Sequence, residues 1–174
     1  MGVINLSKKC TRILGIDPGF GILGYGLIDI NGAKISPVTY GVVQTKPGDA
    51  IPERLIQIYE ELETLITQYR PDEAAVEELF FFRNVTTAIQ VGEARGVVLL
   101  ILRQMEIPIY EYTPHQVKQA VTGYGKAEKG QIQRVMKTFL HLKKTPKPND
   151  AADALAVAWC HFSFRSYPGG ARKL

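Results

Sequence analysis

The stretch Arg12-Ile13-Leu14-Gly15-Ile16-Asp17-Pro18-Gly19 carries the feature that decides how this chain folds. Its apolar residues predict a strand, which the Pro-Gly pair ends. Asp17 lies at the end of that strand, and a carboxylate in apolar surroundings needs a metal, a proton or a partner. Asp17 is therefore the first candidate site residue, although an Asp before Pro-Gly can also simply cap a turn.

The residues that follow predict a sheet built first as an antiparallel meander. Residues 24–30 and 35–44 have strand character, and the Asn31-Gly32 pair between them is typical of a hairpin turn. The rest of the chain alternates helices and strands, with Asn149 as the expected N-cap of the last helix. In order, we expect helix 52–69, strand 74–77, helix 85–104, strand 107–112, and helices 114–121, 127–141 and 149–164.

This order of elements predicts an α/β fold of the ribonuclease H-like type. Strands separated by helices add in parallel through crossover connections. We therefore expect a mixed five-stranded sheet, three antiparallel strands followed by two parallel ones, flanked by helices. Residues 1–174 are expected to form a single domain, with 1–11 and 166–174 as flexible tails.

Composition constrains the partners and the cellular compartment of the protein more than it constrains the chemistry of the protein. The chain has a net charge of +4 and a pI near 9.0, which permits an anionic partner without requiring one. No apolar run approaches the ~20 residues that span a bilayer. Cys10 and Cys160 lack metal-ligand spacing, so we expect free thiols in a reducing cytoplasm.

Three further carboxylates repeat the situation of Asp17. Glu77 ends the apolar strand 74–77, and Asp150 and Asp153 lie three residues apart on one face of an alanine-rich helix. Each has an ordinary explanation, a solvated strand end for Glu77 and helix capping for Asp150. Together they predict a site for hard cations such as Mg²⁺, able to clamp both oxygens of a phosphodiester displacement.

At this point the sequence resembles a known family, the bacterial RuvC Holliday junction resolvases. The resemblance rests on motifs in family order that cover about residues 12–159. They are Ile13-Leu14-Gly15-Ile16-Asp17-Pro18-Gly19, Tyr25-Gly26, Ala75-Val76-Glu77-Glu78-Leu79-Phe80, Ala94-Arg95-Gly96, Gln116-Val117-Lys118-Gln119, Ala127-Glu128-Lys129 and Asp150-Ala151-Ala152-Asp153-Ala154-Leu155-Ala156.

The resemblance implies an endonuclease that resolves four-way DNA junctions by symmetric nicking of two opposing strands. Asp17, Glu77, Asp150 and Asp153 take the catalytic, metal-binding positions, with two Mg²⁺ per site that Mn²⁺ can replace. Some relatives carry His where Asp150 stands, so this chain is of the four-carboxylate type. Water attacks directly in the implied mechanism, without a covalent intermediate, which leaves the three histidines as surface or packing residues.

The resemblance also assigns DNA-binding residues and partners. Lys118 and Lys129 are placed near the scissile phosphate or the backbone, Phe80 against unstacked bases, and Arg83 on nearby DNA. The roles of Phe81, Phe82 and Lys126 stay open. The implied partners are a second copy of the chain and the RuvA and RuvB branch-migration proteins. Residues 85–104 are apolar on several sides, which suits a helix between the sheet and a partner subunit.

Other classes fit less well. An actin-like ATPase or sugar kinase shares a strand followed by Asp-x-Gly, but it needs a second phosphate loop and a second domain. A non-catalytic junction-binding protein has no use for Glu77 and Asp153 in apolar surroundings. A ribonuclease H proper shares the fold and the metals, but the motif set favours branched DNA.

Overall fold

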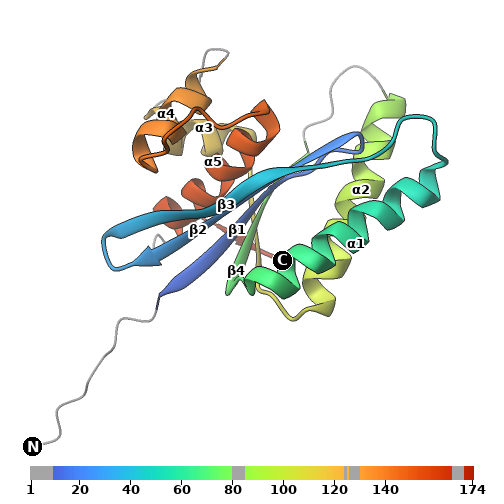
Figure 1. Ribbon diagram of the computed structural model, residues 1–174, viewed down its shortest axis with the longest axis horizontal. Coiled ribbons are helices and arrows are strands. Elements are labelled where there is room, and N and C mark those ends of the chain that lie inside the picture. The colour runs from blue at the N-terminus through green and yellow to red at the C-terminus, as the bar shows by residue number, and fades with distance from the viewer. Residues whose placement is uncertain (1–9, 80–84, 124, 126–129, 166–170) are drawn as a thin grey trace, which may run out of the picture.

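The computed structural model describes residues 10–79, 85–123, 125, 130–165 and 171–174. They form one mixed sheet with helices on both faces (Figure 1). In chain order the elements are β1 (Thr11–Asp17), β2 (Ile22–Asn31), β3 (Lys34–Gln44), α1 (Ile51–Tyr69), β4 (Glu73–Glu77), α2 (Val85–Gln104), β5 (Ile109–Tyr112), α3 (Pro114–Thr122), α4 (Gln131–Phe139), α5 (Asn149–Phe164) and β6 (Arg172–Lys173).

The sheet has the predicted α/β topology. Its strand order is β3-β2-β1-β4-β5-β6. The first three strands form the antiparallel meander, and β4 and β5 then add in parallel beside β1. This arrangement places the carboxyl ends of β1, β4 and β5 at one edge of the sheet.

The predicted strand count and the predicted C-terminal tail both need correction. The sheet has six strands rather than five, because Arg172–Lys173 of the expected 166–174 tail pair antiparallel with β5. The backbone N–H of Leu174 also donates to the carbonyl of Ile109 at 3.0 Å. The pairing satisfies an edge strand and sets Arg172 3.5 Å from the buried carboxylate of Glu111.

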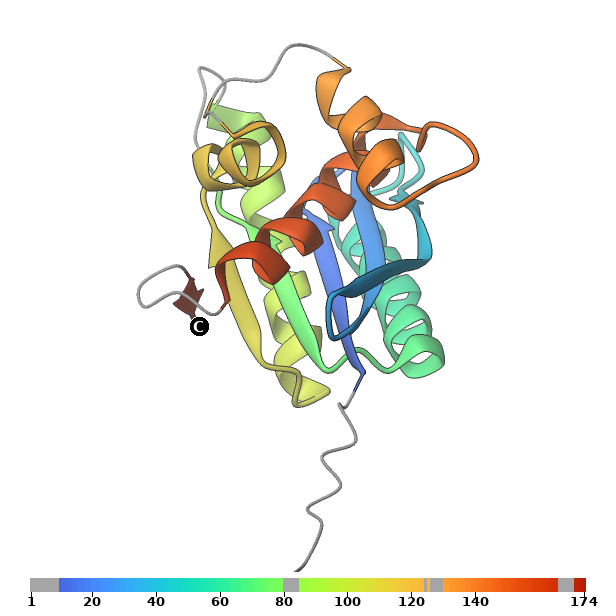
Figure 2. The same ribbon diagram turned by 90° about the vertical axis from the view of Figure 1, so that its left-hand side faces the viewer.

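Different helices cover the two faces of the sheet. α1 and α2 pack on one face, and α3, α4 and α5 lie on the other (Figures 1 and 2). Side chains alternate along β1, so Leu14 and Ile16 join the core under α1 and α2, whereas Ile13 joins the core under α5. The same alternation points Asp17 and Glu77 toward α5.

α5 packs unusually close to the sheet because glycines face it. Figure 2 shows α5 lying across the central strands. A Cβ atom at Gly15 would overlap the carbonyl oxygen of Ala154, and one at Gly24 would overlap that of Asp150. The sequence combines strand glycines with an alanine-rich helix, so backbone meets backbone at this contact.

Several predicted boundaries shift by local hydrogen bonding. Pro148, not Asn149, occupies the N-cap of α5, and Asn149 is its first helical residue. β5 begins at Ile109 because the N–H of Ile107 still bonds the carbonyl of Leu102 and closes α2. The predicted helix 127–141 is α4, whose N-cap is Gly130 with a φ of 78°; residues 127–129 lie outside the described part of the chain.

Candidate acidic active site

Two adjacent parallel strands bring the first two carboxylates together. Ile16 of β1 pairs with Val76 of β4, so Asp17 and Glu77 end neighbouring strands at the same edge. Both side chains are half-buried on the face that α5 covers, and a hydrogen bond joins them. The edge of the sheet therefore holds a carboxyl pair in close contact.

The first turns of α5 bring the other two carboxylates to the same place. Asp150 and Asp153 are half-buried, and their charges act on Asp17. The contact between Gly24 and the Asp150 backbone fixes how near the start of the helix lies to the strand ends. The structure thus gathers all four predicted acidic residues around one point, from two strands and one helix.

Three of these carboxylates have a raised pKa. Burial is the main cause of the raised pKa of Asp17, followed by the charges of Glu77, Asp153 and Asp150. Burial and the charge of Asp153 raise the pKa of Glu77 to about 7, and burial and Asp150 raise that of Asp153 to about 6. The protein therefore holds like charges together at a cost that a cation would remove.

The donor set fits a hard divalent cation. All four groups are carboxylates, which Mg²⁺ and Mn²⁺ prefer over nitrogen or sulfur ligands. Within the described residues, however, no three His, Cys, Asp or Glu side chains already stand in an arrangement that would enclose an ion. The carboxylates are close enough to repel one another but do not form a finished coordination sphere.

Lys118 is the described cation that acts on this cluster. It lies on α3, half-buried, and its charge lowers the pKa of both Glu77 and Asp153. A capping box between Thr113 and Gln116 starts α3, and the indole N–H of Trp159 donates to the Ala120 carbonyl at 3.3 Å. These contacts hold α3, and with it Lys118, beside α5.

Lys118 is the one predicted DNA-binding residue that lies among the described residues. Phe80, Arg83 and Lys129 lie outside the described residues, so their predicted DNA contacts stay predictions. Three residues to which the sequence assigns no definite role also lie outside the described residues; they are Phe81, Phe82 and Lys126. Cys10 and Cys160 are free, Cys10 exposed and Cys160 buried.

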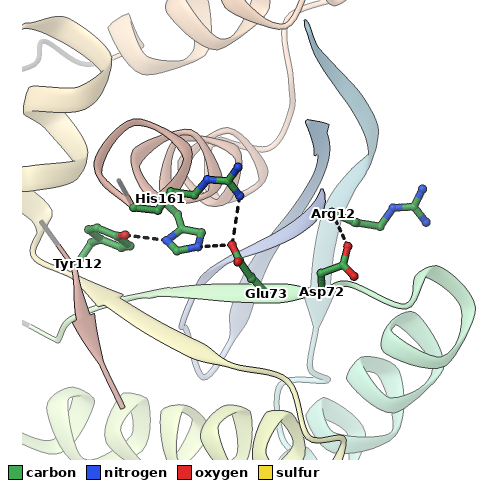
Figure 3. Close-up of polar contacts among 6 residues, drawn as sticks. Arg12, Asp72, Glu73, Tyr112 and His161 are labelled. Atoms are coloured by element: carbon green, nitrogen blue, oxygen red, sulfur yellow. Dashed lines mark hydrogen bonds and ion pairs between the residues drawn. The ribbon is translucent and has the colours of Figure 1, made fainter. Parts of the chain in front are cut away.

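A buried polar network near the site was missed by the sequence reasoning. His161 is fully buried in α5 and contacts Tyr112 Oη through Nδ1 at 2.6 Å and Glu73 Oε2 through Nε2 at 2.8 Å (Figure 3). Arg165 also contacts Glu73, at 3.4 Å. The signal was a histidine within an alanine-rich helix, which its neighbours in sequence do not explain.

A second missed cluster ties α2 to the end of the sheet. The buried carboxylate of Glu111 on β5 pairs with Arg95 of α2 and with Arg172 of β6. Glu111 stands between apolar neighbours in its strand, the same signal that singled out Asp17. Its partners are distant in sequence, so only the fold identifies them.

α2 leaves a row of apolar side chains without cover from this chain. Val85, Ile89 and Leu100 are 74%, 58% and 54% exposed, and a Cβ at Gly92 or Gly96 would meet open space. The expectation that no apolar run approaches bilayer-spanning length needs correction: α2 is the one described helix long and apolar enough to cross a membrane, by length and composition alone. Its opposite side packs into the core through Val98, Ile101 and other residues.

The chain is similar to proteins of one family along most of its length. A family model described as crossover junction endodeoxyribonuclease RuvC matches residues 13–161. The crossover junction endodeoxyribonuclease RuvC of Petrotoga mobilis is 62% identical over 88% of this chain and 94% of its own, and that of Brevibacillus brevis is 56% identical over 90% and 94%.

A solved structure agrees with these relatives. The Thermus thermophilus RuvC in complex with a Holliday junction substrate superimposes with a TM-score of 0.86 at 38% identity, over 94% of this chain and 99% of its own. Because the likeness covers nearly all of both chains, the comparison concerns the complete fold rather than one motif.

Proposed function

Because the chain belongs to the RuvC family of crossover junction endodeoxyribonucleases, it is an endonuclease that resolves Holliday junctions, and we propose that Asp17, Glu77, Asp150 and Asp153 form its active site. The family acts with divalent metal ions, and we infer two Mg²⁺ per site, replaceable by Mn²⁺. One observation carries the assignment: four carboxylates from two strands and a helix converge, and burial together with neighbouring carboxylates raises the pKa of Asp17, Glu77 and Asp153.

The four proposed metal-binding residues come from two kinds of element, strands and a helix. Asp17 and Glu77 extend from the rigid sheet, whereas Asp150 and Asp153 extend from α5. Metal ions held by these carboxylates would supply activation of a water molecule and neutralisation of the charge on the leaving oxygen. Lys118 adds a positive charge at the same edge, suited to a phosphate held beside the carboxylates.

The site's own residues favour attack by water over a covalent intermediate. Cys160 is the thiol near the cluster, but it is fully buried, and burial raises the pKa of its thiol. A protonated, buried thiol is a poor nucleophile. His161 bonds Tyr112 and Glu73 rather than an activated hydroxyl in the site. Direct hydrolysis of the phosphodiester needs neither group.

We propose that four residues around the acidic active site contact DNA. Lys118 is the proposed contact near the scissile phosphate, and Lys129 a second one on the backbone. Phe80 is proposed to stack on unpaired bases, worth about 1–3 kcal/mol per base, and Arg83 to bind nearby DNA. Phe80 and Arg83 follow Glu77 closely in sequence, which supports their place beside the cleavage site.

We infer that two copies of the chain assemble through α2. The row of Val85, Ile89 and Leu100, with the open positions at Gly92 and Gly96, allows a second helix to approach closely. A twofold dimer offers two identical sites to a junction that is cut symmetrically. The remaining proposals are action in the cytoplasm, with the RuvA and RuvB proteins as partners in branch migration.

Cleavage of a synthetic junction tests the active site. The wild type and Glu77→Gln are incubated with a labelled four-way junction or a matched duplex, with Mg²⁺ or with EDTA. We expect cutting of the junction only, only with Mg²⁺, and a loss of at least about 100-fold in the variant because one ligand is gone. Glu60→Gln, an exposed glutamate on α1, is the matched control and should cut normally.

Two results would contradict the proposal. Cutting by Glu77→Gln at the wild-type rate would remove Glu77 from the site. Equal cutting in EDTA would remove the metal ions from the reaction.

A further inference from the structure

α5 carries half of the proposed active site but grips the sheet with short side chains. Its buried face includes Ala151, Ala154 and Ala158, and it lies against strand glycines. Alanine on glycine allows close approach, but it offers few protrusions that interlock along the helix axis. Leu155 adds a larger side chain to this face. Directional contacts elsewhere on α5 would define more sharply how far it sits along the sheet, and hence where its two aspartates lie.

The far end of α5 supplies directional contacts to the sheet. His161 is fully buried and bonds one group on each of two strands, Tyr112 Oη at 2.6 Å and Glu73 Oε2 at 2.8 Å (Figure 3). Arg165 reaches the same Glu73 oxygen at 3.4 Å. Hydrogen bonds depend steeply on distance and angle, so they define the position of the helix in a way that alanine contacts do not.

Each hydrogen bond of His161 can have one donor and one acceptor. Bonding to His161 is the main cause of the lowered pKa of Glu73, which is therefore a carboxylate that accepts from Nε2–H. Nδ1 is then free to accept from the hydroxyl of Tyr112. Tyr110 stacks on the imidazole with ring centroids 4.4 Å apart, which restrains the ring plane. Contacts at both ring nitrogens and on the ring face therefore restrain the imidazole.

One anchoring group lies on the strand that carries Glu77, and the other lies on the neighbouring strand. Glu73 lies four residues before Glu77 on β4, and Tyr112 is the register partner of Glu77 on β5. The N–H of Glu78 also donates to the carbonyl of Tyr112 at 2.8 Å. His161 therefore fastens α5 directly to the strand pair that places Glu77.

From this geometry we propose that His161, held by Tyr112 and Glu73, is a positioning residue that sets Asp150 and Asp153 against Asp17 and Glu77. The proposal rests on the acidic active site proposed above. His161 lies eight residues after Asp153, a distance of about 12 Å along a helix that transmits axial displacement. A displacement of about 1 Å at reacting groups can cost about 100-fold in rate.

The test separates positioning from stability and from DNA binding. The variants are His161→Leu, Tyr112→Phe, which removes one hydroxyl, and Glu73→Gln, whose amide oxygen can still accept from Nε2–H. Leu62→Ala and Ile58→Val, in the core under α1, serve as controls that lower the melting temperature without touching α5. Single-turnover junction cleavage, its half-saturating Mn²⁺ concentration and junction affinity in EDTA are measured at a temperature where every variant is folded.

The expected pattern is a split between chemistry and binding. His161→Leu should lose about 10- to 100-fold in cleavage rate and need more Mn²⁺, while its junction affinity in EDTA stays within about twofold of wild type. Tyr112→Phe should show the same split in smaller measure, and Glu73→Gln should stay close to wild type. The controls should keep their cleavage rate despite a lower melting temperature.

Two outcomes would overturn the positioning role. One is a cleavage rate and Mn²⁺ requirement for His161→Leu no different from those of the core controls. The other is a loss of junction affinity as large as the loss of rate. If His161→Leu does not fold, Tyr112→Phe is judged by the same criteria. Asp153→Asn separates the two proposals: full activity in that variant defeats the acidic site itself, whereas its inactivity beside a normal His161→Leu defeats only the positioning role.

Discussion

At the scale of single residues, the acidic cluster makes the stability of the protein depend on pH. Glu77 and Asp153 have pKa values raised to about 7 and about 6, mainly because both are taken out of water. An acid with a raised pKa binds its proton more tightly in the folded state than in the unfolded chain. Its contribution to stability is therefore full at low pH and is lost as the pH rises through the folded value.

This sign gives a prediction for the metal-free protein. In EDTA, the free energy of unfolding should fall as the pH rises from about 4 through about 7, because Asp153 and Glu77 ionise in the fold. Asp17, whose pKa is also raised well above its usual range, extends the fall. Glu77→Gln removes one of these charges, so it should be more stable than wild type at pH 8 by about 1–3 kcal/mol. Urea unfolding across that pH range measures both effects.

Addition of Mg²⁺ to the same unfolding experiment provides a comparison between the wild type and Glu77→Gln. Saturating Mg²⁺ should restore the stability of the wild type at pH 8 and should do much less for Glu77→Gln, because the variant lacks a ligand and a charge to neutralise. A wild type that grows more stable with rising pH in EDTA would show that the carboxylates are not strained in this way.

At the scale of elements, the site depends on how closely α5 approaches the meander. Gly24 is a strand residue whose place beside the Asp150 carbonyl leaves no room for a side chain. Gly15 and Gly26 meet the same helix further along. These contacts bring a helix with short side chains near enough for its first turn to share a site with strand ends.

Enlarging one of these glycines should therefore damage the site through the backbone. Gly24→Ala should push the start of α5 outward, lower stability by about 1–3 kcal/mol and reduce junction cleavage at least tenfold. Gly21→Ala is the matched control, since a Cβ there meets only the Arg54 side chain at an ordinary 3.6 Å. Equal behaviour of the two variants in thermal melts and cleavage assays would contradict the close-packing argument.

At the scale of the whole molecule, α2 connects the site to a proposed second copy. One side of α2 joins the core, its middle pairs with Glu111 through Arg95, and the opposite side exposes Ile89 and Leu100. Burying that exposed row in a dimer would remove apolar surface from water and orient two acidic edges by symmetry.

A charge placed on this row should prevent assembly while leaving the fold intact. We expect Leu100→Glu to give a monomer in light scattering at micromolar concentration, where the wild type is a dimer, and to lose paired nicking of opposing strands. Ile56→Glu on α1 is the matched control, because Ile56 is 55% exposed and Leu100 is 54% exposed. A monomeric wild type, or a dimeric Leu100→Glu, would exclude α2 as the interface.

The sequence by itself determined the α/β topology and predicted the four carboxylates of the proposed acidic site. Periodic apolar residues identify strands and helices because one face of each must be buried, and carboxylates at strand ends stand out because burial of a charge is costly. Each of Asp17, Glu77, Asp150 and Asp153 has an ordinary local explanation, and only the four together predict a cation site. The α/β order follows from local signals.

Only the tertiary structure decided what depends on contacts between distant segments. The sixth strand forms because β5 has a free edge within reach of Arg172, and a two-residue strand has no periodic signal of its own. The partners of His161 come from residues 49 and 88 positions away, and those of Glu111 from helix α2 and the C-terminal strand. Hydrogen bonds and ion pairs require groups at fixed distances, and those distances exist only once the sheet has been assembled.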